Sequence, residues 1–264
     1  MTTEPELREL QEEFLVAFRY FHKLCMDNGI HYSLHGGSLL GAVREKGFIP
    51  WDDDIDVTMM RSEYEKFRKL MLKGGLDEYF YFDELSAKMP HLCMKRPDRP
   101  NVWISVFIYD YISENTLLRK YKQFYNKYIF LVLNSKDELM KDCKNTFKNR
   151  IKKSVERCLW TIGNRKSRQE NWKRCDRFNQ NRLLGGKTKV FRSNDMLAAN
   201  GIYIILPSNV LDEYMIVPFE DTEAMISKKY DLILSTSYGK DYMTPKQDAS
   251  KDELHDKLRD SLKQ

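Results

Sequence analysis

The pattern of apolar and polar positions along the chain predicts alternating helices and strands. Over residues 4–28, apolar side chains recur at the spacing of one helix face, and Asn28-Gly29 supplies residues typical of a helix C-terminus. Shorter apolar runs follow. Strands are expected near 30–35, 55–59, 79–82, 92–95, 102–109, 189–192 and 203–206, and helices at 38–44, 62–72 and 222–234. This mixture indicates an α/β or α+β core.

Residues 115–183 have a different pattern. They are mostly helical in periodicity and rich in Lys, Arg and aromatic side chains. A chain of 264 residues with 42% hydrophobic content is long enough for one sizeable core, or for a core domain with a helical annex. We therefore expect a single domain over residues 1–264, with a helical insertion at about residues 115–185 within it.

Charge is distributed unevenly. Between residues 141 and 192 there are 17 Lys or Arg against 4 Asp or Glu, a local charge of about +13, which leaves about −8 for the rest of a chain whose net charge is +5. This basic region is either a solvated helical face or a surface for an anionic partner: nucleotide phosphates, a phosphorylated glycan acceptor, or the inner face of a membrane. Nucleic acid is not expected, because no nucleic-acid-binding motif accompanies the charge.

The N-terminal residues and the lengths of the apolar runs indicate the cellular compartment of the protein. The longest apolar runs, such as 202–206, are strand-sized, and the N-terminus lacks the order of basic and then apolar residues found in signal peptides. Five cysteines are widely spaced and no pair has zinc-ligand spacing, so we expect reduced thiols. The prediction is a cytoplasmic protein, with peripheral contact to the inner membrane face as one use of the basic region.

Four aspartates stand within five residues at the start of an expected strand: Asp52, Asp53, Asp54 and Asp56. Carboxylates this dense are costly unless a cation compensates them, and oxygen-only ligation suits Mg²⁺. If residues 54–57 form a strand, Asp54 and Asp56 share a face, and they are the predicted metal ligands. Asp53 and Asp52 would support this site or bind a second ion. Asp53, Asp54 and Asp56 are therefore candidate catalytic residues.

A glycine turn lies shortly before the acidic segment. Gly36 and Gly37 permit a positive φ and let backbone amides approach a phosphate. Ser38 would then begin a helix whose N-terminus favours an anion. Arg44, near the end of that helix, is a further catalytic candidate that contacts phosphate or pairs with the aspartates. The glycine turn and the acidic segment together predict metal-dependent phosphoryl or nucleotidyl transfer.

Two blocks of the sequence resemble the LicD family of phosphocholine transferases of bacterial surface glycans, which is related to the fukutin group. The first block comprises Leu34–Gly41, Arg44, Ile49–Asp56, Arg61 and Tyr64. The second comprises Phe219-Glu220, Tyr230-Asp231, Tyr238–Met243 and Pro245. The resemblance implies a nucleotidyltransferase-like mixed sheet flanked by helices. It also adds Glu220 and Tyr238 to Gly36, Gly37 and Ser38 as candidate substrate-binding residues.

The activity implied by this resemblance is Mg²⁺-dependent transfer of phosphocholine. CDP-choline would be the donor, CMP would leave, and the acceptor would be a hydroxyl of a surface glycan or of a teichoic acid or lipopolysaccharide precursor. The residues themselves do not specify choline. The alternatives are a nucleotidyl or phosphoglycerol transferase on the same fold, or a binding protein that has kept the fold and lost its activity.

The chain departs from the family pattern at Ser105. Family members usually carry a third carboxylate in an Asp-hydrophobic-Phe-Pro stretch, whereas the matching stretch here runs from Trp103 to Asp110 with serine at the expected position. A serine can bind a metal-bound water, but it is neutral and a poor general base. Asp110 lies five residues further along, and it would need a bulge or bend in the strand to substitute. Ser105 therefore motivates the hypothesis of lost activity.

Overall fold

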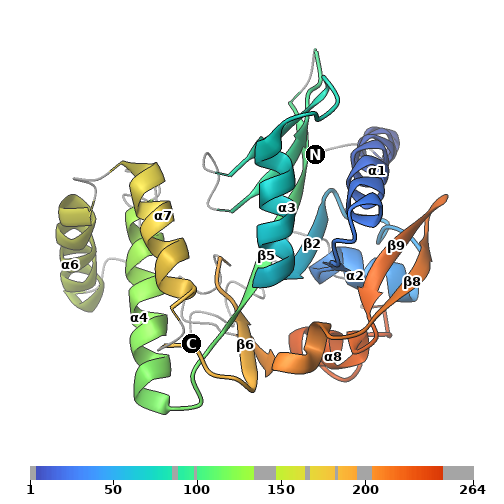
Figure 1. Ribbon diagram of the computed structural model, residues 1–264. Helices are drawn as coiled ribbons and strands as arrows, with labels where there is room; N and C mark the ends of the chain where they lie inside the picture. The colour runs from blue at the N-terminus through green and yellow to red at the C-terminus, as the bar shows by residue number, and fades with distance from the viewer. Residues whose placement is uncertain are drawn as a thin grey trace.

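The computed structural model describes residues 4–84, 89–97, 100–133, 147–163, 167–181, 184–194 and 204–245. The helices in these ranges are α1 (Glu4–Asp27), α2 (Gly36–Arg44), α3 (Arg61–Lys73), α4 (Thr116–Leu133), α6 (Phe147–Gly163), α7 (Arg168–Asn179) and α8 (Tyr230–Tyr238). The strands are β1 (Ser33–Leu34), β2 (Ile55–Met60), β3 (Phe80–Asp83), β4 (His91–Met94), β5 (Val102–Tyr111), β6 (Lys189–Arg192), β7 (Ile205–Pro207), β8 (Tyr214–Phe219) and β9 (Thr222–Ser227). Figure 1 shows their arrangement.

Seven of these strands form one mixed sheet, which confirms the predicted α/β class. Its order is β1-β2-β5-β4-β3, with β6 paired to β5 and β7 paired to β6. β2 and β5 are parallel, and the other pairs are antiparallel. A parallel pair needs a crossover connection, and α3, β3 and β4 lie in the connection between β2 and β5. β8 and β9 form a separate hairpin.

The two faces of β2 and β5 have different roles. Ile104, Val106 and Ile108 are completely buried in the main hydrophobic cluster, on the face where α1 and α3 pack. Side chains alternate between the faces of a strand, so Ser105 and, on β2, Asp56 lie on the opposite face. Burial of the apolar positions thus fixes which polar side chains stand together.

The helices of the predicted insertion pack as a separate layer beside the sheet (Figure 1). α4 contacts α6 and α7, and a second hydrophobic cluster contains Ile129, Leu133, Trp172 and Cys175. The buried Lys122 of α4 joins this layer to the sheet, because its Nζ donates to the carbonyl oxygens of Tyr111 and Asn179, each at 2.8 Å. The division into one domain with an insertion stays a prediction.

The predicted helix at 222–234 is wrong. Residues 222–227 form β9, which pairs with β8, and a helix begins only at Tyr230. Four consecutive residues from Ala224 to Ser227 are buried between neighbouring elements, a pattern that periodicity does not distinguish from a buried helix. The turn at Glu220-Asp221 was also hidden, because Glu220 adopts φ +54° without the glycine or asparagine that usually marks such a turn.

Smaller differences concern element boundaries. The strand expected at 30–35 consists of Ser33–Leu34 alone, and Asp54 lies just before β2 rather than within it. Gly36 and Gly37 belong to the first turn of α2. Part of the strand expected at 203–206 and the tail after residue 249 lie outside the described residues.

Two further observations bear on the sequence predictions. Within the described ranges, no helix combines the length and apolar character required to cross a membrane. Cys25, Cys93, Cys158 and Cys175 are free thiols, and Cys143 lies outside the described residues.

Candidate active site

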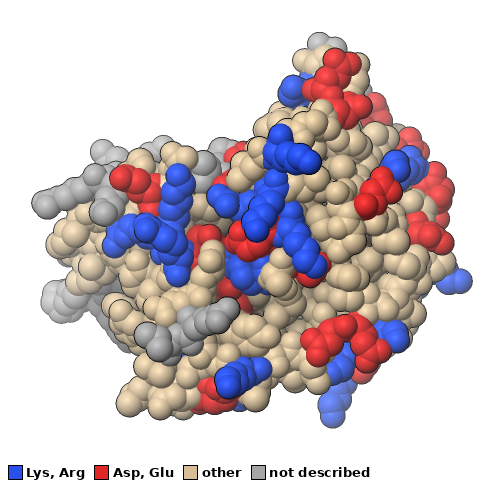
Figure 2. All heavy atoms as spheres, in the orientation of Figure 1, with Lys and Arg blue, Asp and Glu red and all other residues tan. Residues whose placement is uncertain are grey.

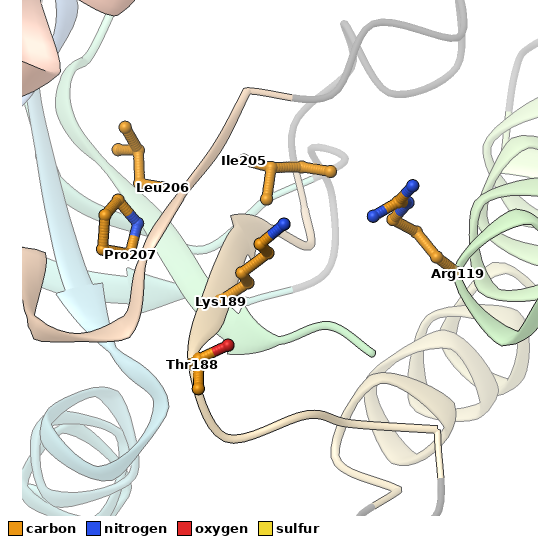
Figure 3. A pocket seen from close by; sticks show the side chains of 6 residues that line it. All are labelled: Arg119, Thr188, Lys189, Ile205, Leu206 and Pro207. Carbon is orange, nitrogen blue, oxygen red and sulfur yellow. The ribbon is translucent and has the colours of Figure 1, made fainter. Parts of the chain in front are cut away.

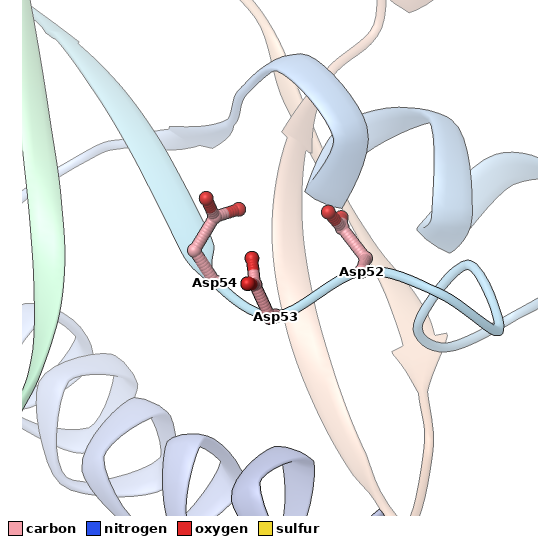
Figure 4. Close-up of side chains that lie close together, drawn as sticks. All are labelled: Asp52, Asp53 and Asp54. Carbon is pink, nitrogen blue, oxygen red and sulfur yellow. The ribbon is translucent and has the colours of Figure 1, made fainter. Parts of the chain in front are cut away.

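The acidic segment forms a compact carboxylate cluster at the start of β2. One carboxylate oxygen from each of Asp52, Asp53 and Asp54 lies within 4.8 Å of the others. Figure 4 shows the three side chains on the loop that enters β2, with their carboxylates turned to the same side. Asp52 is buried and Asp53 is exposed, while Asp54 is half-buried. The fully buried Ile55 that follows draws this loop against the core.

Electrostatics add Asp56 to this cluster. Burial, followed by the charges of Asp56 and Asp52, raises the pKa of Asp54 to about 8. Such a shift means that ionising all of the aspartates at once is unfavourable in the folded protein. A bound divalent cation would offset this cost by compensating their negative charge. The donors are carboxylate oxygens, the ligands that Mg²⁺ prefers. The residues therefore fit a hard cation, and the choice of Mg²⁺ with Asp54 and Asp56 as ligands stays a prediction.

The N-terminus of α2 lies directly against the carboxylates. Gly36 has φ +55°, and a Cβ on Gly37 would lie 2.6 Å from Oδ2 of Asp52, so the Asp52 carboxylate would have to shift to accommodate it. The buried Ser38 hydroxyl accepts a hydrogen bond from the backbone N–H of Asp56 at 3.0 Å. These contacts position the acidic segment. Phosphate binding by Gly36, Gly37 and Ser38 stays a prediction.

Tyr238 belongs to the same neighbourhood. It is the last residue of α8, and its hydroxyl oxygen lies 3.8 Å from the place where a Cβ on Gly36 would stand. Burial, together with the nearby carboxylates of the cluster, raises the pKa of Tyr238. The second block of the sequence thus contributes a phenol beside the aspartates, although the two lie far apart in the chain.

Arg192 is a basic residue at the site that sequence reasoning did not single out. It pairs with Tyr109 in the β5–β6 register, and its guanidinium lies 5.9 Å from the centre of the Phe107 ring. Nη1 of Arg192 is hydrogen-bonded to Nε2 of His35, whose backbone N–H donates to the carbonyl oxygen of Asp56 at 2.9 Å. Burial and the Arg192 charge lower the pKa of His35, so the imidazole is neutral.

No local signal distinguishes Arg192 from its neighbours in the sequence. It is one of 17 Lys or Arg residues in the basic region, and only the pairing of β6 with β5 carries it to this face. A buried cation that is linked through His35 to Asp56 is suited to binding a phosphate group near the aspartates.

Arg44 is held at the other end of α2. Eight residues separate it from Gly36, so roughly 12 Å of helix lies between them. Its Nε donates to Oε1 of Glu45 at 2.6 Å and its Nη1 to the carbonyl oxygen of Tyr242 at 3.4 Å. These contacts are structural, and a catalytic role for Arg44 stays a prediction.

Glu220 is likewise engaged in contacts within the fold. Its Oε1 accepts from the backbone N–H of Phe48 at 3.0 Å, and its Oε2 accepts from Arg8 at 3.0 Å. Its own backbone N–H donates to the carbonyl oxygen of Lys46 at 2.7 Å. Glu220 therefore fastens the loop after α2 to the β8–β9 hairpin, and its role in substrate binding stays a prediction.

Ser105 lies on β5, the strand next to β2. It is the direct partner of Asp56 in the parallel β2–β5 register, which runs without a bulge from Ile55 to Met60. Asp110 instead accepts hydrogen bonds from Arg61 at 2.9 and 2.6 Å. Burial alone would raise the pKa of Asp110, but the Arg61 charge outweighs it and the pKa is lowered. The regular register excludes substitution of Asp110 through a bulged strand.

The fold and the carboxylate cluster define a nucleotidyltransferase-type domain. Residues 29–150 match the family described as LicD/FKTN/FKRP, nucleotidyltransferase domain. This part of the chain, which includes α2, β2 and β5, is a LicD-family transferase domain.

Comparison with curated proteins gives three partial matches. The chain is 61% identical over 73 residues to the lipopolysaccharide cholinephosphotransferase LicD of Haemophilus influenzae, a segment that covers 28% of each protein. It is 42% identical over 50 residues to an uncharacterised protein of Rickettsia typhi, which covers 19% of this chain and 16% of the relative. It is 48% identical over 42 residues to one of Rickettsia prowazekii, which covers 16% of both. These matches span less than a third of each relative.

Proposed function

We propose that this protein is a Mg²⁺-dependent transferase that moves phosphocholine from CDP-choline to a hydroxyl of a bacterial surface glycan or its lipopolysaccharide or teichoic acid precursor. The observation that carries the proposal is the Asp52–Asp54 cluster in a LicD-family domain. The head group is inferred from the segment that is 61% identical to a lipopolysaccharide cholinephosphotransferase. The reaction takes place in the cytoplasm, where CDP-choline and Mg²⁺ are available.

The residues of the cluster have separate roles in this proposal. Asp54 and Asp56, with Asp53 beside them, hold the ion, which when bound neutralises the charge on the donor phosphates. Arg192 binds a phosphate oxygen and positions the diphosphate against the start of α2. Tyr238 forms part of the wall that excludes water from the transferred group.

The acceptor is proposed to approach over the basic helical layer. Figure 2 shows Lys and Arg side chains over α7 and α3, and Lys173 and Arg177 of α7 are exposed. A cavity of about 570 Å³ lies between this layer and the sheet. In Figure 3 Arg119 of α4 and Lys189 of β6 extend into the same space, beside Ile205. Two cations next to an apolar wall suit an anionic sugar phosphate or a lipid-linked precursor at the inner membrane face.

Titration calorimetry and product release test this function together. CDP-choline should bind more tightly with Mg²⁺ than without it, and CMP should be released. Two other donors test the alternative functions. CDP-glycerol is the donor expected for a phosphoglycerol transferase, and CTP is the donor expected for a nucleotidyl transferase. Binding of CDP-choline without release of CMP would instead support the hypothesis, raised by Ser105, of a binding protein that has lost its activity.

A further inference from the structure

Four polar residues form a row across the sheet next to the carboxylate cluster. Asp83 of β3 pairs with His91 of β4, His91 pairs with Ser105 of β5, and Ser105 pairs with Asp56 of β2. Directly paired residues project from the same face of a sheet, with Cβ atoms about 5 Å apart. A carboxylate, an imidazole, a hydroxyl and a second carboxylate therefore stand in line, and the last of them belongs to the candidate active site.

This row lies on the face of the sheet that carries the side chain of Asp56, opposite the main hydrophobic core. Ile104 and Val106 of β5 point into the core, whereas Trp103 projects from the same face as Ser105 and is 43% exposed. The centre of the His91 ring lies 5.9 Å from the centre of the Trp103 ring, so His91 is next to an exposed side chain. His91 itself is 8% exposed, which shields the ring from bulk water without removing it from the face.

The His91 side chain is present as a neutral imidazole. Burial lowers the pKa of His91 to about 4, against the opposing charge of Asp83, so the imidazole is neutral at physiological pH. A neutral imidazole has one ring nitrogen that can accept a proton. The neighbouring Asp83 stabilises the imidazolium once it has formed, as an aspartate beside a catalytic histidine does.

We propose that His91 is the general base toward the acceptor hydroxyl, in place of the carboxylate that the family pattern has at position 105. Ser105, which pairs with both His91 and Asp56, has a smaller side chain than an aspartate, and we place the acceptor hydroxyl beside it. This inference rests on the proposed transferase function and adds the residue that activates the acceptor.

The step conserves atoms and charge. The acceptor oxygen forms a bond to the phosphorus of the phosphocholine group, and its proton moves to the free ring nitrogen of His91. The bond between this phosphorus and the oxygen bridging to CMP breaks, and CMP leaves with the electron pair. His91 then releases the proton to water, which restores the neutral imidazole.

The test compares His91→Gln with the wild type in CMP release from CDP-choline and Mg²⁺, with water or added methyl glucoside as the acceptor probe. Loss of a general base should lower kcat about 100-fold or more, while the Kd for CDP-choline stays unchanged. The control is His31→Gln, which replaces an exposed histidine outside the row and should retain the wild-type kcat.

A second pair of variants separates proton transfer from packing. Added imidazole should restore part of the turnover of His91→Ala. In the second test, Ser105→Asp should restore part of the turnover of His91→Gln, because it returns a carboxylate to the face of the sheet that carries Asp56. Wild-type kcat in His91→Gln, or loss of turnover that neither imidazole nor Ser105→Asp relieves, would overturn the role of His91. If the wild-type protein released no CMP, the transferase function itself would fail, and the role of His91 with it.

Discussion

At the scale of single residues, the site combines crowded negative charge with one buried cation. Burial of Asp54, followed by the charges of Asp56 and Asp52, raises the pKa of Asp54. Arg192 stands on the same face, joined through His35 to the backbone of Asp56. A cation that approaches the aspartates and an anion that approaches Arg192 are both favoured, which is the combination required by a metal-bound diphosphate.

Arg192→Lys tests the phosphate contact. A lysine retains the charge but loses the planar fork of donors, and one charge-assisted hydrogen bond contributes about 1.5–3 kcal/mol. We expect the Kd for CDP-choline to rise about 10-fold or more, as measured by titration calorimetry in Mg²⁺. Arg177→Lys, at an exposed position of α7, is the matched control. Equal donor affinity in the Arg192 variant and the wild type would remove Arg192 from the binding site.

At the scale of elements, the sequence predicted the parts that depend on local pattern. The periodicity of α1, the apolar positions of β2 and β5, and the acidic segment before β2 are all local properties, and each was located close to its true position. The family resemblance placed Ser105 on a strand that neighbours the metal motif, and in the structure Ser105 pairs directly with Asp56.

The features that the sequence did not reveal depend on pairing between distant segments. β9 was predicted as a helix because buried consecutive residues carry no clear period and because Glu220 forms an unusual turn. His91 and Arg192 looked ordinary in the sequence. Their places beside Ser105 and over Phe107 arise only from the pairing of β4 and β6 with β5.

The attachment of the helical layer to the sheet leads to a prediction about pH. Burial lowers the pKa of Lys122 to about 8 from its ordinary 10.5. Between these values the unfolded chain binds the proton and the folded protein does not, so stability rises with pH across this window. Relative to Lys122→Met, the wild type should gain on the order of 2 kcal/mol in unfolding free energy between pH 8 and pH 10.

Urea unfolding of both proteins at several pH values measures this difference. Lys127→Met, an exposed lysine of the same helix, is the control and should follow the wild type. A constant difference between the wild type and Lys122→Met from pH 8 to pH 10 would show that the folded protein keeps Lys122 charged through its two carbonyl contacts.

At the scale of the whole molecule, charge is divided between two regions. The basic stretch 141–192 carries about +13, and the rest of the chain, which contains the aspartate cluster, carries about −8. In the proposed reaction the carboxylates attract Mg²⁺, whereas the basic region is suited to an anionic acceptor. Residues 141–146, 164–166 and 182–183 of this stretch lie outside the described residues, and the function of the stretch is inferred from its charge.

The basic region, residues 141–192, should bind anionic surfaces in a salt-dependent manner. Vesicles of phosphatidylglycerol should bind the protein at low salt and release it as the ionic strength rises past about 0.15 M, where the Debye length is about 8 Å. Neutral phosphatidylcholine vesicles are the control in a sedimentation assay. Binding that does not change with salt, or no binding at low salt, would support the alternative that this region is an ordinary solvated helical face.

The most direct test of the account is CMP release from CDP-choline by Asp54→Asn and Asp56→Asn, each compared with Asp212→Asn at an exposed position outside the cluster. Each cluster variant should lose turnover by about 100-fold or more, because ionised ligands and the charge stabilisation they support are removed. Its melting temperature should stay within a few degrees of the wild type, because the change relieves crowded negative charge. Wild-type rates of CMP release in both cluster variants would contradict the assignment of this site.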